Sequence, residues 1–306
     1  MTTPRPADEG PSPSGSPLLA VGCLVINAWV WGLSWWPFRQ LQDRGLHPLW
    51  STALVYAAAV LCVLAWRPLA WRQLFRHPGL WLLLAAAGMT NVGFNWAVSV
   101  GDVVRVVLLF YLMPAWSILL AWPLLGERPS RASLLRLALA LAGVVVVLKS
   151  PDSPWPVPSS SADWLAVGGG LSFALTNILL RRLGHTPSEG RMLAMFGGGA
   201  VLAAGAAALG VALGLVSPPT LGDGGWPIAI GLCLAFLVSN LALQYGAARL
   251  AASTTSLVML TEILFASLSS AWLGAAQIDA RTLVGGALII VAALLAALQP
   301  RRPEPP

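Results

Sequence analysis

Glu262 is the residue whose type and position in this sequence most clearly suggest chemistry. It lies near the middle of an apolar run, residues 251–274, that has the length of a membrane-spanning helix. The other acidic residues fall in the tails, in loops or beside the ends of apolar runs. An ionisable side chain at membrane depth costs roughly 2.5–3.5 kcal/mol, so by default it marks a candidate functional site.

Three roles are open to this carboxylate. A carboxylate removed from water tends to bind a proton, which would suit a proton-coupling group. Glu262 could instead accept a hydrogen bond from a substrate amine, or be a protonated structural residue bonded to nearby amides. No basic residue lies within one helical turn of it, so any ionic partner must come from another span.

Carboxamide side chains recur at helical spacing in other apolar runs. Asn91 and Asn95 share one helical face, as do Asn240 and Gln244, because residues four apart lie on the same side of a helix. An amide offers two donors and a carbonyl, which suits a polar organic solute, although amides also hold membrane helices together. The candidate substrate-binding set is Asn27, Trp31, Trp35, Asn91, Asn95, Trp96, Tyr111, Pro114, Asn240, Gln244 and Glu262.

Aromatic residues and one proline complete this set. Trp31 and Trp35 share a face with Asn27 and, with Trp96, would form apolar walls beside the amides. Pro114 removes a backbone donor in the middle of its run and kinks the helix. The kink either frees a carbonyl toward a cavity or only shapes the packing, and Tyr111 lies one turn before it on the same side.

The elements that position these residues are membrane spans. Only 10% of the 306 residues are charged and 57% are hydrophobic, whereas a soluble protein carries about 25% charged residues. A bilayer core needs roughly twenty apolar residues per helix. We therefore expect an all-α polytopic membrane protein with ten transmembrane helices, at about 18–38, 46–66, 78–99, 103–125, 134–148, 163–180, 192–216, 226–247, 251–274 and 282–298.

The basic residues predict the orientation of these spans. With both termini in the cytoplasm, twelve arginines lie on the cytoplasmic side, and Arg136 falls inside the fifth span. The opposite side then holds only Arg39, Arg44, Arg105, Lys149 and Arg281. Since short cytoplasmic loops are rich in Lys and Arg, we expect both termini inside the cell and the protein in the inner membrane. The net charge of +6 therefore reflects orientation and does not indicate nucleic acid.

The two halves of the chain repeat each other. Residues 110–127 align without a gap on 258–275, which places Pro114 on Glu262, and a similar shift places Asn91 on Asn240. Because each half has an odd number of spans, the second half enters the bilayer from the opposite side, as in many secondary transporters. The expected domains are a disordered tail (1–17), a first five-helix repeat (18–149), a linker (150–162), a second repeat (163–299) and a cytoplasmic tail (300–306).

The segment LFYLMPAWSILLAWPLLGERPSRASLLRLALALAGVVVVL, residues 109–148, resembles the first-half signature of the EamA-like family in the drug/metabolite transporter superfamily. In that family an apolar span with a mid-helix proline ends in a Gly-Glu turn before a glycine-containing helix. Residues 251–298 resemble the second-half copy, with Glu262 at the family's glutamate position, and Trp31-Gly32 resembles its first-span Trp-Gly. Ile263 replaces the proline that commonly follows this glutamate.

The resemblance implies transport, since members export amino acids, other metabolites or drugs, and others import sugars. We expect a secondary transporter that exports a small amino-acid-like or amphiphilic metabolite by alternating access between two inverted halves. The expected partners are this small-molecule substrate and the lipid bilayer, with proton coupling as an open role of Glu262. We expect no cofactor, no metal and no nucleic acid, and either a monomer or a homodimer.

Two other classes of function remain open, namely an intramembrane lipid-modifying enzyme and a non-transporting membrane scaffold. An enzyme would need a nucleophile or a metal set within the spans. The sequence has no His-Glu-x-x-His or Gly-x-Ser-x-Gly motif, and its three histidines lie outside the expected spans. The three cysteines lie in apolar runs without metal-ligand spacing, so the prediction is that the protein is not an enzyme.

Overall fold

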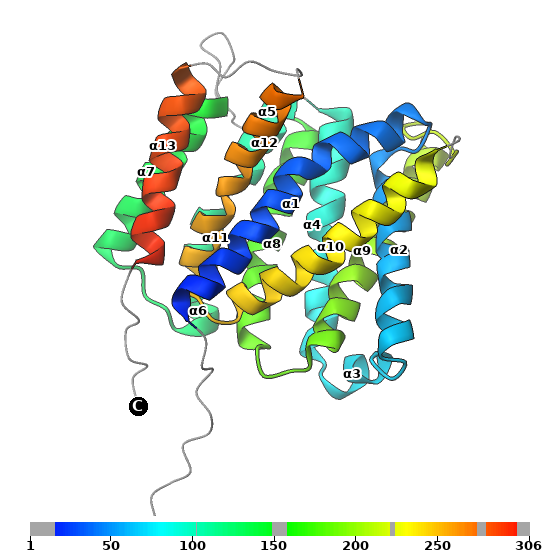
Figure 1. Cartoon of the computed structure of the whole chain (residues 1–306), viewed down its shortest axis with the longest axis horizontal. Helices are drawn as coiled ribbons and strands as arrows, with labels where there is room; N and C mark the ends of the chain where they lie inside the picture. The colour runs from blue at the N-terminus through cyan, green and yellow to red at the C-terminus, as the bar shows by residue number, and fades with distance from the viewer. Residues whose placement is uncertain (1–15, 102, 149–157, 221–223, 274–279, 299–306) are drawn as a thin grey trace, which may run out of the picture.

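The computed structural model describes residues 16–101, 103–148, 158–220, 224–273 and 280–298. Within these ranges the chain is helical and contains no strand, which confirms the predicted all-α class (Figure 1). The helices are α1 (Pro17–Asp43), α2 (Pro48–Trp66), α3 (Trp71–Arg76), α4 (Gly79–Val100), α5 (Val103–Phe110), α6 (Met113–Leu125), α7 (Arg131–Leu148), α8 (Ser161–Arg182), α9 (Ser188–Ala212), α10 (Gly225–Ala247), α11 (Ala252–Met259), α12 (Thr261–Trp272) and α13 (Ala280–Ala297).

Seven of the described segments are long and apolar enough to cross a membrane, and Leu283–Ala296 is a shorter apolar helix. The seven are Pro17–Asp43, Pro48–Trp66, Val106–Leu125, Ser161–Arg182, Ser188–Ala212, Gly225–Ala247 and Ala252–Trp272. The apolar helices α4 and α7 have 22 and 18 residues. The two predicted tails, apart from Ser16 and Pro17, and most of the predicted linker lie outside the described residues.

Local sequence signals explain where several helices begin. Ser160 and Asp163 form a capping box at the start of α8, in which each side chain accepts a hydrogen bond from the other residue's backbone N–H. The helices α1, α2 and α6 each carry a proline in the first turn, where its missing N–H costs nothing. Because the capping box lies where the linker was expected, α8 begins two residues earlier than predicted.

The expected span 103–125 is interrupted between α5 and α6. Pro114 has no N–H to bond the carbonyl of Phe110, so the helical ladder loses a bond one turn before it. Leu112 donates its N–H to the carbonyl of Leu109 at 3.3 Å, a tighter turn than an α-helix makes. The kink predicted from Pro114 is thus a break that leaves Tyr111 and Leu112 between two helices.

The expected span 251–274 is also interrupted, although it contains no proline. Leu260 separates α11 from α12, and the hydroxyl of Thr261 donates to the carbonyl of Val258 at 2.7 Å. Ile263 donates to the carbonyl of Leu260 at 3.1 Å, again with the spacing of a tight turn. Leu112 and Leu260 are equivalent in the alignment of 110–127 with 258–275, so both halves break at the same position.

The helices pack in pairs drawn from the two halves of the chain. The helix α4, from the first half, packs on α8 and α9 of the second half. The helix α10, from the second half, packs on α1 and α2 of the first half. The helices α1 and α12 are in contact, as are α8 and α6, while α7 pairs with α13 at one edge of the molecule (Figure 1). Glycines allow close approach: a Cβ on Gly143 of α7 would lie 2.7 Å from the carbonyl oxygen of Gly285 on α13.

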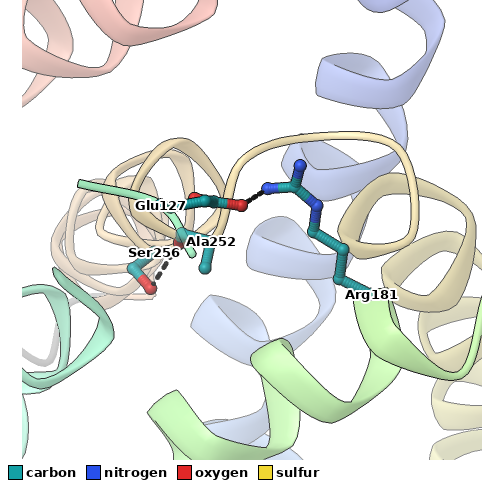
Figure 2. A network of polar contacts seen from close by, with 4 residues as sticks. All are labelled: Glu127, Arg181, Ala252 and Ser256. Atoms are coloured by element: carbon teal, nitrogen blue, oxygen red, sulfur yellow. Dashed lines mark hydrogen bonds and ion pairs between the residues drawn. The ribbon is translucent and has the colours of Figure 1, made fainter. Parts of the chain in front are cut away.

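Polar contacts also join the halves. Glu127, in the turn after α6, forms an ion pair with Arg181 near the end of α8 (Figure 2). The hydroxyls of Ser117 on α6 and Ser256 on α11 are hydrogen-bonded. The buried Arg136 of α7 donates to the carbonyl of Leu295 on α13 at 3.2 Å. This contact accounts for an arginine inside an apolar helix, because the positive guanidinium bonds a carbonyl near the C-terminal end of α13, where the helix dipole is negative.

Candidate functional site

A cavity of about 80 Å³ lies at the meeting point of α1, α2, α4, α5, α8, α9, α10, α11 and α12. This volume exceeds the roughly 10–15 Å³ that one water molecule needs, so the cavity has room for several waters or a small solute. Its described lining is Asn27, Trp31, Tyr56, Ala87, Thr90, Asn91, Phe94, Asn95, Phe110, Phe173, Thr176, Met195, Phe196, Phe236, Ser239, Asn240, Leu243, Met259 and Glu262. Both halves of the chain therefore contribute to one cavity.

Aromatic rings form two walls of the cavity. In one wall Trp31 stacks on Phe236 with centroids 4.6 Å apart, and Tyr56 meets Phe236 edge-on at 5.7 Å. In the other wall Phe110 lies 4.8 Å from Phe94 and 6.0 Å from Phe173. Ring pairs at these separations are mutually attractive, so the walls hold their shape without a ligand.

The asparagines of the cavity are hydrogen-bonded to the helices around them. Asn27 on α1 donates to the carbonyl and the hydroxyl of Ser239 on α10, at 3.0 and 2.6 Å. Asn95 on α4 donates to the hydroxyl of Thr52 on α2 at 2.7 Å. Asn91 accepts from the hydroxyl of Tyr56 at 3.1 Å. These bonds fix the amides in place, since breaking a buried one leaves its partner unsatisfied at a cost of about 1–3 kcal/mol.

Glu262 enters the cavity from the first turn of α12. The partial positive charge at a helix N-terminus stabilises a negative side chain there. Tyr111, which lies in the break between α5 and α6, is close enough to Glu262 for the phenol and the carboxyl group to interact. The two helix breaks thus bring a hydroxyl from one half and a carboxylate from the other together.

The structure places six of the eleven predicted site residues in the cavity lining, namely Asn27, Trp31, Asn91, Asn95, Asn240 and Glu262. Tyr111 lies behind Glu262, and Gln244 lies behind Asn240, to which it donates at 2.6 Å. Trp35 donates from its indole nitrogen to the Ser269 hydroxyl at 2.9 Å, outside the lining.

Trp96 and Pro114 are also absent from the lining. Trp96 packs against two small apolar clusters around Leu49 and Ala53, between α2 and α9. Pro114 is buried in the first turn of α6, where its effect is on the backbone. Some of the helical faces predicted to bind solute therefore line the cavity, and others pack against neighbouring helices.

Several lining residues were not predicted, above all Tyr56, Phe196 and Phe236. Tyr56 and Phe196 come from α2 and α9, where no polar pattern set them apart from other apolar residues. Phe236 had a signal, because it lies four residues before Asn240 on the face of the predicted amides. Phe173 had a usable signal, because the alignment of the first and sixth spans at a shift of 142 places Trp31 on it. Ser239 and Thr176 are small hydroxyl residues of the kind that membrane helices commonly carry.

The described residues contain no cluster of three His, Cys, Asp or Glu side chains that could hold a metal ion. Cys23, Cys62 and Cys233 form no disulfide. Within the part of the chain that the structure describes, Glu262 is the sole carboxylate in the cavity lining, and no arginine, lysine or histidine accompanies it.

Residues 18–149 match the model of the EamA-like transporter family. This half of the chain is EamA-like. The match confirms the resemblance predicted from the sequence, and it includes Asn27, Trp31, Asn91 and Asn95 of the cavity. The match covers residues 18–149, and the second EamA-like repeat, 163–299, stays a prediction.

Two relatives are similar to about half of the chain. The chain is 29% identical over 163 residues to Protein RarD of Streptomyces exfoliatus, which is 50% of this chain and 49% of that protein. It is 27% identical over 167 residues to an uncharacterized transporter of Pseudomonas aeruginosa, which is 52% of this chain and 53% of that protein. The chain thus matches about half the length of each relative.

One solved crystal structure has the same fold. It superposes with a TM-score of 0.71 at 18% sequence identity and covers 92% of this chain and 98% of its own. At this level of identity the likeness establishes the arrangement of the helices and not the activity.

Proposed function

We propose that this protein is a secondary transporter that moves a small metabolite out of the cell. The observation that carries the proposal is the cavity that both halves of the chain line with amides, aromatic rings and a carboxylate. A few polar groups set among apolar walls are the usual composition of a small-molecule site. The named transporter among the relatives and the EamA-like first half support the same class.

The transporter has ten spans in two inverted five-helix repeats. Exchanging the halves pairs α1 with α8, α2 with α9, α4 with α10, α5–α6 with α11–α12 and α7 with α13. Under this exchange the contact of α4 with α8 becomes that of α10 with α1, and both contacts are present. The equivalent breaks at Leu112 and Leu260 support the repeat further, since broken helices near the membrane centre recur in transporters of this kind.

Alternating access follows from this arrangement. The cavity lies between the halves, so rocking one half against the other would open it to each side of the membrane in turn. The excess of arginine in alternate loops supports termini on the cytoplasmic side. The export direction rests on the resemblance to exporters of the family.

The test is solute transport by the purified protein in liposomes, with solutes chosen by comparing metabolites of overexpressing and deletion cells. We expect saturable flux above that of protein-free vesicles. Vesicles that contain the protein but move no such solute would contradict the proposal, and turnover of a lipid in them would favour the enzyme.

A matched pair of variants links the flux to the cavity. Thr90 lines the cavity and its hydroxyl bonds only its own helix, to the carbonyl of Ala86, whereas its neighbour Met89 is 44% exposed. Thr90→Phe should fill the cavity and lower the flux about tenfold or more, which is roughly 1.4 kcal/mol. Met89→Phe adds a similar ring at the surface and should leave the flux unchanged. Equal fluxes from the two variants would show that the transported solute does not pass through this cavity.

A further inference from the structure

Hydrogen bonds within the protein engage part of the donors around the cavity. Asn27 donates to the carbonyl and the hydroxyl of Ser239, whereas Asn95 donates one bond to Thr52 and Asn91 donates one to the carbonyl of Ala87 at 2.8 Å. The hydroxyl of Tyr56 is given to Asn91. Each of these bonds ends on a protein atom, so these donors are already engaged, while Asn91 and Asn95 each keep a second N–H.

The hydroxyls of the two threonines follow the same pattern. Thr90 donates to the carbonyl of Ala86 at 2.9 Å, and Thr176 donates to that of Ser172 at 2.9 Å. A hydroxyl that has given its proton keeps only lone pairs to offer. The side-chain oxygen of Asn27 is buried and has no hydrogen-bond partner. An unpartnered buried acceptor of this kind invites a donor from a bound solute.

The charges and the rings point the same way. Glu262 contributes the one carboxylate of the described lining, and no arginine, lysine or histidine balances it there. Seven of the nineteen described lining residues are aromatic. The faces of aromatic rings carry negative potential and attract cations within about 6 Å. Acceptors, a carboxylate and ring faces together make an environment that stabilises positive charge and repels negative charge.

We infer that the cavity selects a protonated amine with a flat apolar body, and disfavours anions and zwitterionic amino acids. The ammonium lies at Glu262, where its N–H groups bond the carboxylate. The apolar body lies between the wall of Trp31 and Phe236 and the opposite wall, which is built around Phe110. A free amino acid adds a carboxylate for which the described lining has no cation. This inference rests on the proposed function, because it takes the cavity as the site of the transported solute.

The proposal is tested by equilibrium binding to the purified protein with four probes that share one phenyl ring and differ in charge. Phenethylamine is a cation, phenethyl alcohol is neutral, hydrocinnamate is an anion and phenylalanine is a zwitterion. We expect phenethylamine to bind about tenfold or more tightly than each of the other three. This ranking needs no variant, so it holds as a test whether or not a substitution folds.

The variants assign the preference to Glu262. Glu262→Gln keeps the shape and removes the charge, so phenethylamine should bind it no more than about twofold more tightly than the alcohol, a difference of RT ln 2. Glu189→Gln removes the same charge from the start of α9, outside the described cavity lining, and should keep the wild-type ranking. A preference for the amine that survives in Glu262→Gln would overturn the assignment.

The remaining outcomes separate this inference from the proposed function. Equal or tighter binding of phenylalanine, hydrocinnamate or the alcohol overturns the cation preference, and so does a failure of phenethylamine to bind. If liposomes then move another solute, transport stands without the preference. If phenethylamine binds in the expected order but no solute crosses the membrane, the preference stands and the proposed transport falls.

Discussion

At the scale of single residues, the amide of Asn27 both joins two helices and lines the cavity. Asn27 holds α1 to α10 through Ser239, and its oxygen is left toward the interior without a partner. An amide fixed by its donors presents its acceptor in a set direction, which a freely rotating side chain could not do. The choice between helix glue and cavity lining that the sequence left open therefore resolves, for this residue, into both.

His47 provides a prediction at the same scale, at the start of α2. Its Nδ1 accepts a hydrogen bond from the N–H of Leu49 at 3.2 Å, which requires a neutral ring, and burial lowers the pKa of His47 from its ordinary 6.5. The unfolded chain thus takes up the proton first as the pH falls. The stability that this cap adds is present above pH 6.5 and is lost below it.

We expect the variant His47→Asn to lose less thermal stability than the wild type between neutral and mildly acidic pH. Asparagine is a strong N-cap that does not titrate, and a cap is worth about 1 kcal/mol. The measurement is the unfolding temperature in detergent across this range. His185→Asn, which changes an exposed histidine, is the control and should keep the wild-type slope. If the unfolding temperature of His47→Asn changed with pH as much as that of the wild type, the cap would not be the cause of the pH dependence.

At the scale of elements, the contact of α1 with α12 positions the carboxylate. A Cβ on Gly32 would lie 2.8 Å from the carbonyl oxygen of Glu262 and 2.6 Å from the Cβ of Phe265. Trp35 reinforces the same contact through its hydrogen bond to Ser269. The Trp-Gly pair seen in the sequence therefore acts through close packing: the glycine admits α12, and the tryptophan before it faces the cavity.

Gly32→Ala is the corresponding prediction. The added methyl must separate α1 from α12, and overpacking of this kind costs about 1–3 kcal/mol. We expect a lower unfolding temperature and a reduced solute flux, because Glu262 moves with α12. Gly22→Ala on the same helix is the matched control, since nothing lies within 4 Å of its added Cβ. If Gly32→Ala and Gly22→Ala changed the unfolding temperature and the flux equally, the close α1–α12 contact at Gly32 would not be needed for either.

At the scale of the whole molecule, the two halves are joined at one end by the ion pair of Glu127 and Arg181 (Figure 2). Both side chains are partly exposed, at 24% and 29%, so the pair contributes about 1 kcal/mol or less. Such a contact can be broken and remade during a conformational cycle at small cost. The ion pair links α6 of the first half to α8 of the second half. If the halves move against each other in alternating access, this link must stretch or break.

A charge-swap cycle tests this link. Glu127→Arg and Arg181→Glu each place like charges together and should lower the unfolding temperature, while the double variant restores an opposite pair and should recover most of the loss. Solute flux, measured on the same four proteins, should change in the single variants and return in the double one. Additive losses in the double variant would show that the two side chains act independently.

Much of the fold was predictable because its signals are local. The lengths of the apolar runs, the prolines at helix starts and the kink at Pro114 act through the backbone of their own segment. The family resemblance of the first half likewise lies in contiguous residues. The break at Leu260 was not predicted, since no proline or glycine lies there, and it is marked by the hydrogen bonds of Thr261 to Val258 and of Ile263 to Leu260.

The candidate site divides in the same way. Helical periodicity placed Asn27 and Trp31 on one face with Trp35, but only the tertiary packing decided that Trp31 meets Phe236 while Trp35 meets Ser269. The rings of Tyr56, Phe196 and Phe236 come from three different helices, and nothing in the segments of Tyr56 and Phe196 marks those two rings. The sequence by itself determined which groups could bind a solute, because residue type and helical face are local. Only the tertiary structure decided which of them share one cavity, because that depends on where distant helices meet.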